Sequence, residues 1–533
     1  MTGKRQLSPK KRAQLIKRRK ERRLIKKVSL YTFLINLISA VVLFVMIASY
    51  KFLPSKYLIL LGVIFVITIS IFAIAALIPN IKSGIKIFQS VISGILAIFM
   101  IVGCLILPVY LGKLERIFVS VPTEGSLNIN VYVLNDTGFN EIEDLAGKTV
   151  GIQKDLDLDY QNYAIKIVNK EIVGQDIEVV ELENIYSAVE KLYAREVDAI
   201  MLNQDYVDII KDNKDFSDFA SKVKLLYQCT QKIKIVTDTA AISNITKEPF
   251  IIALTGVDQW NYSTISASVR VRSDVNIVLA VNPINKQILM VTLPRDSYVP
   301  LNGNYNKMDK LTHATTLSDG INSWINTLNE VLDIDVNYYL RVNFSSLVDI
   351  INAIDGIDVN NPYYFETNFV IYDYDANDND GVTGEHKAFE KGIIHLNGEE
   401  ALAYCRERYY VKADGHMIGD LGRNKHQALV LKATIDKVSS VAIITKIGKL
   451  LESLDGKFTS NIETKDIYAL AQMQLDDMAD WTILTYAVTG YGDYLDSYVM
   501  GIKLSMVVLN KNELSQAKQY INQILNNQIV EID

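Results

Sequence analysis

Side chains that could bind phosphate gather in the C-terminal half of this 533-residue chain, and arginine dominates them. Each lies beside an apolar run, where the pattern predicts the end of a strand or the start of a helix. A guanidinium group is planar, can bind two phosphate oxygens at once and stays charged in a partly dry site. The arginines exceed what the nearby carboxylates could pair, which indicates a polyanionic substrate. The set consists of Asp258, Arg272, Asp274, Arg295, Asp296, Arg406, Arg408, Asp420 and Arg423.

Two aspartates that converge from neighbouring strands would also suit a hard cation such as Mg²⁺, which prefers one or two carboxylates together with substrate phosphate oxygens. The chain has five histidines and no HExxH pattern, so a zinc hydrolase is disfavoured. The spacing of Cys104, Cys229 and Cys405 fits neither a zinc cluster nor a disulfide framework, and we expect the last two to be unpaired.

A simpler interpretation exists for each of these residues alone, because an Arg beside an Asp is more often a structural ion pair than a functional site. The set as a whole favours function. Arg406 and Arg408 stand two residues apart and cannot share one face of a helix. We therefore expect the helix to end there and both side chains to enter one cleft.

Apolar runs with strand and helix patterns must position these residues. Three predicted strands cover residues 251–260, 272–283 and 287–299, and several helical patterns follow them. This mixture predicts an α/β or α+β sandwich with a central mixed sheet. The predicted helices cover residues 321–334, 343–355, 396–409 and 420–438.

The N-terminal region predicts a membrane anchor. Residues 1–27 carry a net charge of +12, residues 28–116 carry +5, and the remainder carries −23. Three uncharged apolar runs, Val28 to Tyr50, Tyr57 to Pro79 and Ile87 to Leu111, are each long enough to cross a bilayer. The basic tail favours a cytoplasmic N-terminus, so three crossings place the C-terminal domains outside the cell membrane. Lipid is a better partner for this tail than nucleic acid.

Between the anchor and the arginine-rich region, residues 120–246 alternate short strand and helix patterns, which predicts an extracytoplasmic α/β accessory domain. The strings LAGKTVGIQ (145–153) and EVDAIMLN (196–203) resemble one lobe of a periplasmic solute-binding fold. A complete two-lobed binding protein would need about twice this length. We therefore expect a non-catalytic domain, followed by the catalytic domain over residues 247–533.

Seven short motifs follow one another along residues 250–430: GVD (256–258), RSD (272–274), NP (282–283), TLPRDSYV (292–299), DKLTHA (309–314), LNGEEALAYCRERY (396–409) and GDLGRNKHQ (419–427). In order and spacing they resemble the LytR-CpsA-Psr family. The basic tail, three spans and extra outer domain resemble its capsule-associated members.

This resemblance implies a ligase that transfers a glycan polymer, of capsular polysaccharide or teichoic acid type, from a polyprenyl pyrophosphate carrier to peptidoglycan through a phosphodiester bond. Other envelope biosynthesis proteins would be partners. Carried over by motif, Asp258 and Asp274 would hold Mg²⁺, and Asp258 or Asp420 would be the base. Asp296 would orient Arg295. The pyrophosphate would be held by Arg272, Arg295, Lys310, Arg406, Arg408, Arg423 and Gln427.

One departure concerns the last motif, where the family often has an arginine directly before the glutamine. Here Lys425 and His426 precede Gln427, which leaves open whether either substitutes for the missing cation. Two other functions also stay open: a non-catalytic envelope sensor or assembly factor, and a hydrolase that cleaves the polyprenyl pyrophosphate carrier with water.

Overall fold

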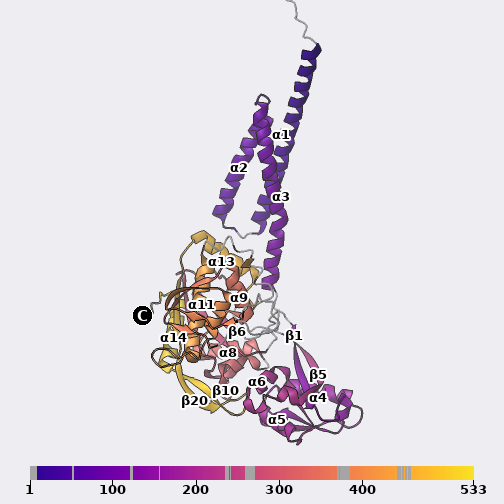
Figure 1. Cartoon of the computed structure of the whole chain (residues 1–533), viewed down its shortest axis with the longest axis vertical. Helices are drawn as coiled ribbons and strands as arrows, with labels where there is room; N and C mark the ends of the chain where they lie inside the picture. The colour runs from indigo at the N-terminus through magenta and orange to yellow at the C-terminus, as the bar shows by residue number, and fades with distance from the viewer. Residues whose placement is uncertain are drawn as a thin grey trace, which may run out of the picture. The chain divides into compact units, whose positions relative to one another are not determined.

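The computed structural model forms two compact units, Met1–Glu115 with Thr464–Ala479, and Arg116–Glu463 with Asp480–Asp533 (Figure 1). Each unit is considered by itself. The structure describes all residues except 1–8, 51–52, 120–123, 155, 235–238, 240–241, 258–269, 318, 369–370, 373–383, 441–445, 447–448, 451–452, 454–457 and 533.

The first unit contains three long apolar helices, which confirms the three predicted helical spans. They are α1 (Pro9–Tyr50), α2 (Ser55–Leu77) and α3 (Ser83–Val119), and each includes a stretch long and apolar enough to cross a membrane. The basic tail is helical from Pro9 onward and runs into the first apolar stretch without a break. The unit also includes α13 (Thr464–Asp477). Which end of each span faces the cytoplasm stays a prediction.

Polar side chains inside this bundle find partners on neighbouring helices. Ser29 Oγ donates to Gln89 Oε1 at 2.5 Å, and Asn36 Nδ2 donates to a backbone carbonyl of α3 at 3.2 Å. The Lys86 ammonium donates to the carbonyls of Ala75 and Ala76, in the last turn of α2. A lysine at a helix C-terminus satisfies carbonyls that lack partners within the helix. The bundle therefore buries these polar groups with hydrogen bonds.

The second unit contains two sheets. The first has the strand order β3-β2-β4-β1-β5, with β2 parallel to β3 and β4, and β1 antiparallel to β4 and β5. Alternate residues of β1 face opposite sides of this sheet, so both sides are packed. Its elements are β1 (Glu124–Leu134), β2 (Thr149–Gln153), α4 (Leu158–Glu171), β3 (Glu178–Leu182), α5 (Ile185–Tyr193), β4 (Ala199–Asn203), α6 (Val207–Asp212), α7 (Phe219–Lys222) and β5 (Val223–Lys234).

The second sheet has six strands in the order β18-β11-β6-β7-β8-β19. It is mixed, because β11 pairs with β6 and β19 with β8 in parallel, whereas the β6-β7-β8 core is antiparallel. This confirms the predicted fold class. The strands are β6 (Phe250–Val257), β7 (Val275–Asn282), β8 (Gln287–Thr292), β11 (Tyr338–Asn343), β18 (Phe458–Ser460) and β19 (Thr482–Ala487).

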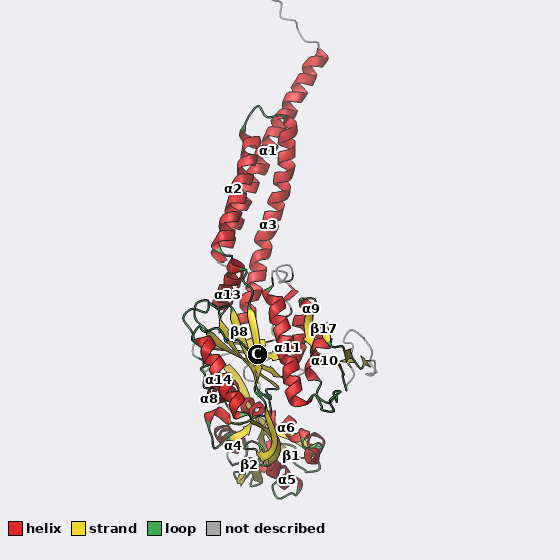
Figure 2. Cartoon of the chain, turned by 90° about the vertical axis from the view of Figure 1, so that its left-hand side faces the viewer, coloured by secondary structure: helices red, strands yellow, loops and turns green. Residues whose placement is uncertain are grey.

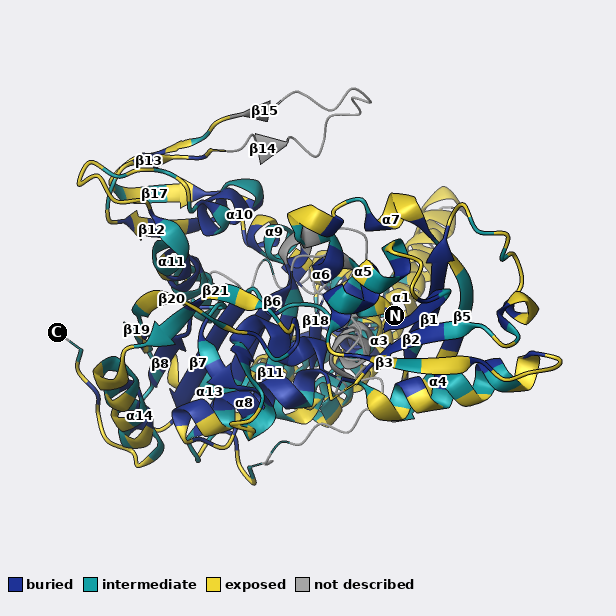
Figure 3. Ribbon diagram, turned by 90° about the horizontal axis from the view of Figure 1, so that it is seen from below, coloured by how far each residue is buried: buried dark blue, intermediate teal, exposed yellow. Residues whose placement is uncertain are grey.

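Helices cover both faces of the six-stranded sheet, and β7 is buried along its whole length (Figure 3). A strand covered on both faces is expected to be apolar throughout, as β7 nearly is. In Figure 2, α8 and α14 lie on one face and α11 on the other. The helices are α8 (Ile321–Leu332), α9 (Phe344–Ala353), α10 (Gly398–Arg406), α11 (Gly419–Ser439) and α14 (Lys511–Leu525).

Short strand pairs complete the unit and connect the larger elements. Each pair is antiparallel. They are β9 (Tyr298–Pro300) with β10 (Met308–Lys310), β12 (Ile357–Asn361) with β17 (Gly392–Leu396), β13 (Phe365–Glu366) with β16 (Ala388–Phe389), β14 (Ile371–Tyr372) with β15 (Gly384–Glu385), and β20 (Gly490–Asp496) with β21 (Lys503–Leu509).

Candidate phosphate-binding site

One edge of the six-stranded sheet gathers the predicted residues. Since β6, β7 and β8 are antiparallel neighbours, the end of β6, the start of β7 and the end of β8 lie together. The Asp274 backbone N–H donates to the Gly256 carbonyl at 2.9 Å, which continues the ladder to this edge. Asp274 precedes β7, and Arg295 follows β8 by three residues.

Arg295 is the centre of the site. Its Nη1 donates to Asp274 Oδ1 at 2.6 Å, and its Nε lies 3.8 Å from Asp296 Oδ2 and 3.9 Å from Asp420 Oδ1. Desolvation alone would lower the pKa of Arg295, but the three carboxylates outweigh it and raise the pKa above its ordinary value. The guanidinium therefore stays charged and is held from three sides.

The first turn of α11 contributes a second ion pair, between Arg423 Nη2 and Asp420 Oδ1, one helical turn apart. Burial lowers the pKa of Arg423, and its proximity to Arg295 and Arg408 acts in the same direction, against the effect of Asp420. Three buried atoms here have no hydrogen-bond partner among the described residues: Arg295 Nε, Arg423 Nε and Asp420 Oδ2. The cations at this edge are thus incompletely compensated, which suits an anionic ligand.

The end of α10 carries Arg406 and Arg408, and the helix ends at Arg406, in agreement with their spacing. Between them, Glu407 is fully buried. Its carboxylate accepts hydrogen bonds from the backbone N–H groups of Asn368, Tyr409 and Tyr410 at 2.6–2.9 Å. Because Glu407 is anchored inward, its two arginine neighbours are half-buried rather than enclosed. The Arg408 guanidinium lies 4.7 Å from the centroid of the Tyr409 ring. The sequence pattern did not single out Glu407.

Lys310, at the end of β10, lies 2.8 Å from Asp296 Oδ1. Desolvation would raise the pKa of Asp296, but Lys310 and Arg295 outweigh this effect and lower it. Asp296 is therefore an anion that joins the two cations. This arrangement agrees with a role for Asp296 in orienting Arg295.

The residue before Lys310 anchors it. Asp309 is fully buried, and its carboxylate contacts the Lys310 backbone N–H (2.7 Å), His313 Nδ1 (2.9 Å), Ser497 Oγ (2.7 Å) and the Val499 backbone N–H (2.7 Å). Two of these partners come from the C-terminal part of the chain. The motif DKLTHA contains both Asp309 and His313, but sequence spacing alone does not show that Asp309 also pairs with residues 188 and 190 positions away.

We predict that Asp309→Asn lowers the free energy of unfolding by about 3 kcal/mol, because the amide cannot accept from all of these donors. Desolvation opposes ionisation of Asp309, but His313, Val499 and Ser497 lower its pKa overall. Its contribution is therefore present above the ordinary aspartate pKa of about 4 and is lost as the pH falls below it. Chemical denaturation from pH 7 to pH 3 measures this.

The matched control is Asp358→Asn, because Asp358 also pairs with a histidine, His395 at 2.7 Å, but both side chains are more than half exposed. We expect it to change stability by less than about 0.5 kcal/mol. Equal losses in the Asp309 and Asp358 variants would contradict the assigned role of the buried carboxylate.

In the last motif, the side chains of His426 and Gln427 lie on the buried side of α11, whereas Lys425 is exposed. His426 lies among aromatic rings, with its Nδ1 3.1 Å from the Tyr404 carbonyl and its Nε2 2.9 Å from the Tyr363 hydroxyl. Burial lowers the pKa of His426 to about 4. It is therefore neutral near pH 7 and does not replace the cation that the family often has at this position.

Not every predicted residue can be placed with its contacts. Asp258 lies outside the described residues. Arg272 is half-buried in the extended stretch before β7, two residues from Asp274. The structure thus brings together Asp274, Arg295, Asp296, Lys310, Asp420 and Arg423 through ion pairs, and Arg408 acts electrostatically on Arg423.

The oxygen donors at this edge decide whether a metal ion fits. Among the described residues, no group of three or more His, Cys, Asp or Glu side chains is arranged to hold a metal ion. Mg²⁺ needs only one or two carboxylates when phosphate oxygens complete its coordination. Asp274, at this edge, is an oxygen donor of the right type, and the second predicted ligand, Asp258, lies outside the described residues. The donor chemistry therefore fits Mg²⁺ only together with a phosphate ligand.

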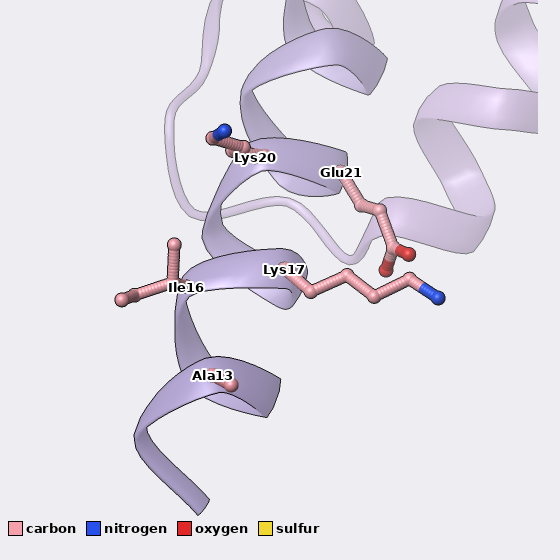
Figure 4. Close-up of a pocket in the computed structure, with 5 residues that line it drawn as sticks. All are labelled: Ala13, Ile16, Lys17, Lys20 and Glu21. Carbon is pink, nitrogen blue, oxygen red and sulfur yellow. The ribbon is translucent and has the colours of Figure 1, made fainter. Parts of the chain in front are cut away.

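A separate hollow lies on α1, in the basic tail (Figure 4). Its lining comes from consecutive turns of this one helix, and every lining residue is exposed. Among the described residues, its lining comes from α1 alone. The lining residues are Ala13, Ile16, Lys17, Lys20 and Glu21.

The geometry defines a class of protein: a chain with three apolar helices and an α/β domain that gathers arginines and aspartates at one edge of its mixed sheet. The family model named LytR_cpsA_psr family matches residues 216–521. Because this match covers more than half of the chain, the protein belongs to the LytR-CpsA-Psr family.

Relatives with known names support the same assignment. The chain is 34% identical over 254 residues to the polyisoprenyl-teichoic acid–peptidoglycan teichoic acid transferase TagV of Bacillus subtilis (strain 168), an alignment that covers 48% of this chain and 60% of TagV. It is 32% identical over 249 residues to TagU of Bacillus licheniformis, which covers 47% of this chain and 71% of TagU. The match to TagV thus spans less than two thirds of that relative.

Two solved structures are also similar. The crystal structure of B. subtilis TagV is 30% identical, with a TM-score of 0.41, over 52% of this chain and 98% of that one. TagT with bound octaprenyl pyrophosphate lipid is 25% identical, with a TM-score of 0.37, over 54% of this chain and 93% of that one.

Proposed function

We propose that this protein transfers a glycan polymer, of capsular polysaccharide or teichoic acid type, from a polyprenyl pyrophosphate carrier to peptidoglycan. The observation that carries the proposal is the Arg295 cluster, where Arg295, just after β8, and Arg423, from α11, meet at one sheet edge. Each has a nitrogen atom without a hydrogen-bond partner among the described residues. The names of TagV and TagU support the reaction class, since both are described as teichoic acid transferases that act on peptidoglycan.

In this reaction a sugar hydroxyl of peptidoglycan attacks the phosphorus attached to the glycan. A new oxygen–phosphorus bond forms, the bond to the bridging oxygen of the pyrophosphate breaks, and polyprenyl phosphate leaves. Arg295 and Arg423 bind the phosphate oxygens and stabilise the charge that develops on them. Asp420 Oδ2 has no hydrogen-bond partner among the described residues, and we assign it as the base that accepts the hydroxyl proton.

The remaining cationic residues would extend this contact along the pyrophosphate. Arg272, Arg406 and Arg408 are half-buried, which leaves each of them partly accessible to a ligand. Lys310 would contribute a point charge beside Asp296, and Gln427 a neutral hydrogen-bonding group from α11. Bound Mg²⁺, held by Asp274 and Asp258, would neutralise phosphate charge and make polyprenyl phosphate a better leaving group.

The cell membrane is the proposed location, with the N-terminus in the cytoplasm and both α/β domains outside. The three apolar helices and the net charge of +12 on residues 1–27 support this topology. The −23 net charge of residues 117–533 makes the arginine cluster a local exception in an acidic region. The extra α/β domain is the feature that favours the capsule-associated branch of the family.

The test uses the full chain in detergent with Mg²⁺, a labelled polyprenyl-pyrophosphate oligosaccharide and isolated peptidoglycan. We expect the label to become covalently attached to peptidoglycan, and EDTA to reduce the rate at least about tenfold. Release of free sugar phosphate without attachment would indicate a hydrolase instead. Binding of the carrier with neither product would indicate a sensor or assembly factor.

A further inference from the structure

A buried charge cluster joins the two sheets of the second unit. Arg270, in the stretch that leads into β7, is only 3% exposed. Its backbone N–H donates to the carboxylate of Asp205, and its guanidinium lies 5.7 Å from the centroid of the Tyr160 ring. Its charge also acts on Asp157. Asp157, Tyr160 and Asp205 all belong to the five-stranded sheet and its helices, so Arg270 crosses from one sheet to the other.

These partners lie at the carboxyl ends of parallel strands. Asp157 follows β2, and Asp205 follows β4, its parallel neighbour. Asn203 Nδ2 and the Tyr206 hydroxyl both donate to Asp157 Oδ2, at 3.0 and 2.9 Å. This edge is where open α/β sheets bind their ligands. Here the Arg270 guanidinium lies 5.7 Å from the centroid of the Tyr160 ring, in the helix that follows β2.

Without the Arg270 guanidinium, the buried carboxylates of Asp157 and Asp205 would lose part of the positive charge that stabilises them. Burial raises the pKa of Asp205 to about 6, and Arg270 and Arg341 act against this increase. Burial also raises the pKa of Asp157, which Asp319 reinforces and Arg270 opposes. A buried carboxylate that loses its cation is costly. The attraction between Arg270 and these two carboxylates therefore holds the two sheets together at this point.

The residues that follow Arg270 lead directly to the sheet edge that contains Asp274 and Arg295. The Val271 carbonyl accepts from Thr315 Oγ1 at 2.5 Å, and the Ser273 backbone N–H donates to the Thr312 carbonyl at 3.3 Å. Asp274 comes next and holds Arg295 at 2.6 Å. Only three residues separate Arg270, whose guanidinium lies near the Tyr160 ring, from Asp274, the carboxylate that binds the central arginine. A shift of this stretch at Arg270 would move Asp274.

We propose that Arg270 is a positioning residue. Its contacts with the accessory domain fix the stretch that carries Arg272 and Asp274, and this stretch in turn positions Arg295. The accessory domain is then part of the machinery that shapes the pyrophosphate site. This inference rests on the proposed function, because Arg272 and Arg295 bind the pyrophosphate there. It adds to that function a role for a domain that contributes no catalytic residue.

The experiment compares full chains in detergent that carry Arg270→Met, Arg270→Lys or the double change Asp157→Asn and Asp205→Asn. In the transfer assay we expect Arg270→Met to raise KM for the polyprenyl-pyrophosphate donor about tenfold and to leave KM for peptidoglycan unchanged. Arg270→Lys should recover most of the loss, since it keeps a positive charge that attracts both carboxylates. The double change should resemble Arg270→Met.

Hydrogen exchange provides a readout that does not depend on activity. The backbone N–H groups of Ser273 and Asp274 are both hydrogen-bonded, and we expect them to exchange at least about tenfold faster in Arg270→Met. The matched control is Arg195→Met, because Arg195 also pairs with an aspartate of the accessory domain, Asp136, but both side chains are more than half exposed. The control should match wild type in both readouts.

The inference is overturned if Arg270→Met equals Arg195→Met in donor KM and in exchange, or if KM for donor and acceptor rise together. If wild type transfers nothing, the proposed function fails, and the exchange comparison still decides whether Arg270 fixes this stretch. If Arg270→Met does not fold, Arg270→Lys and the aspartate pair carry the same comparison.

Discussion

Arg295→Ala should lower kcat/KM for transfer about 1000-fold, the largest effect of any single change in this site. The guanidinium is held by Asp274 and lies close to Asp296 and Asp420, so its geometry is fixed before the substrate arrives. Removing one preorganised donor from a developing oxyanion costs about 3–4 kcal/mol, which corresponds to a factor of about 100–1000. Loss of the charge beside a pyrophosphate places Arg295 at the upper end of this range.

The second variant, Arg295→Lys, separates charge from shape. An ammonium group keeps the positive charge between the three carboxylates but cannot bind Asp274 and a phosphate oxygen through one planar fork. We therefore expect a loss of about 30–100-fold in kcat/KM, intermediate between wild type and Arg295→Ala. Its folding should be close to that of wild type, because the carboxylates keep a cation.

Circular dichroism and thermal unfolding of the full chain establish that the Arg295 variants are folded before their rates are compared. Arg195→Met serves again as the control, since it removes an arginine from an exposed ion pair. Transfer by folded Arg295→Ala within about threefold of wild type would refute the central role of this guanidinium.

Much of this arrangement follows from local sequence patterns. The apolar runs before Arg295 and after Asp274 predict strands, and antiparallel hairpins bring such strand ends to one edge. The polar start of the predicted helix over residues 420–438 likewise indicates where Asp420 and Arg423 stand. These residues are therefore predictable from the sequence, because short-range periodicity decides both their elements and their place at the ends of those elements.

The supporting contacts are not predictable in the same way. Asp309 is held by Ser497 and Val499, which lie almost two hundred residues later in the chain. Glu407 resembles any surface glutamate in sequence but is fully buried. Arg270 joins a sheet whose strands precede it by many residues. Each contact depends on how separate elements pack, and no local pattern encodes that packing.

His426, in the last motif, is a further residue whose role the sequence does not decide. A histidine next to Gln427 could be a cation at the phosphate site or a neutral part of the core. The structure assigns it to the core: the His426 ring lies 4.7 Å from the Phe365 ring and 4.4 Å from the Tyr404 ring, centroid to centroid. Tyr363 also contacts it, at 2.9 Å through its hydroxyl.

This assignment predicts a pH-dependent stability. Burial lowers the pKa of His426 to about 4, below its ordinary value of about 6.5. Because the folded state favours the neutral ring, the contribution of His426 is complete above pH 6.5 and is lost as the pH falls toward 4. The difference amounts to roughly 3 kcal/mol. Chemical denaturation at pH 7 and pH 4 measures it.

His426→Phe isolates this effect from other titrating groups. The phenyl ring keeps the aromatic packing but cannot be protonated, so the stability of the variant should fall by roughly 3 kcal/mol less than that of wild type between pH 7 and pH 4. Losing the hydrogen bonds to Tyr363 and the Tyr404 carbonyl should cost about 1–3 kcal/mol at pH 7. An equal pH dependence in both proteins would contradict a buried neutral histidine.

The opposite change, His426→Arg, introduces the cation that the family resemblance led us to expect next to Gln427. Surrounded by Phe365, Tyr363 and Tyr404, the guanidinium would lack a carboxylate partner, and we expect a loss of about 3–5 kcal/mol in the free energy of unfolding. Transfer activity should survive in His426→Phe, because a neutral ring in the core contributes no charge to the substrate. The positive charge on this side of the site then comes from Arg423 and Arg408, whose mutual proximity already lowers the pKa of Arg423.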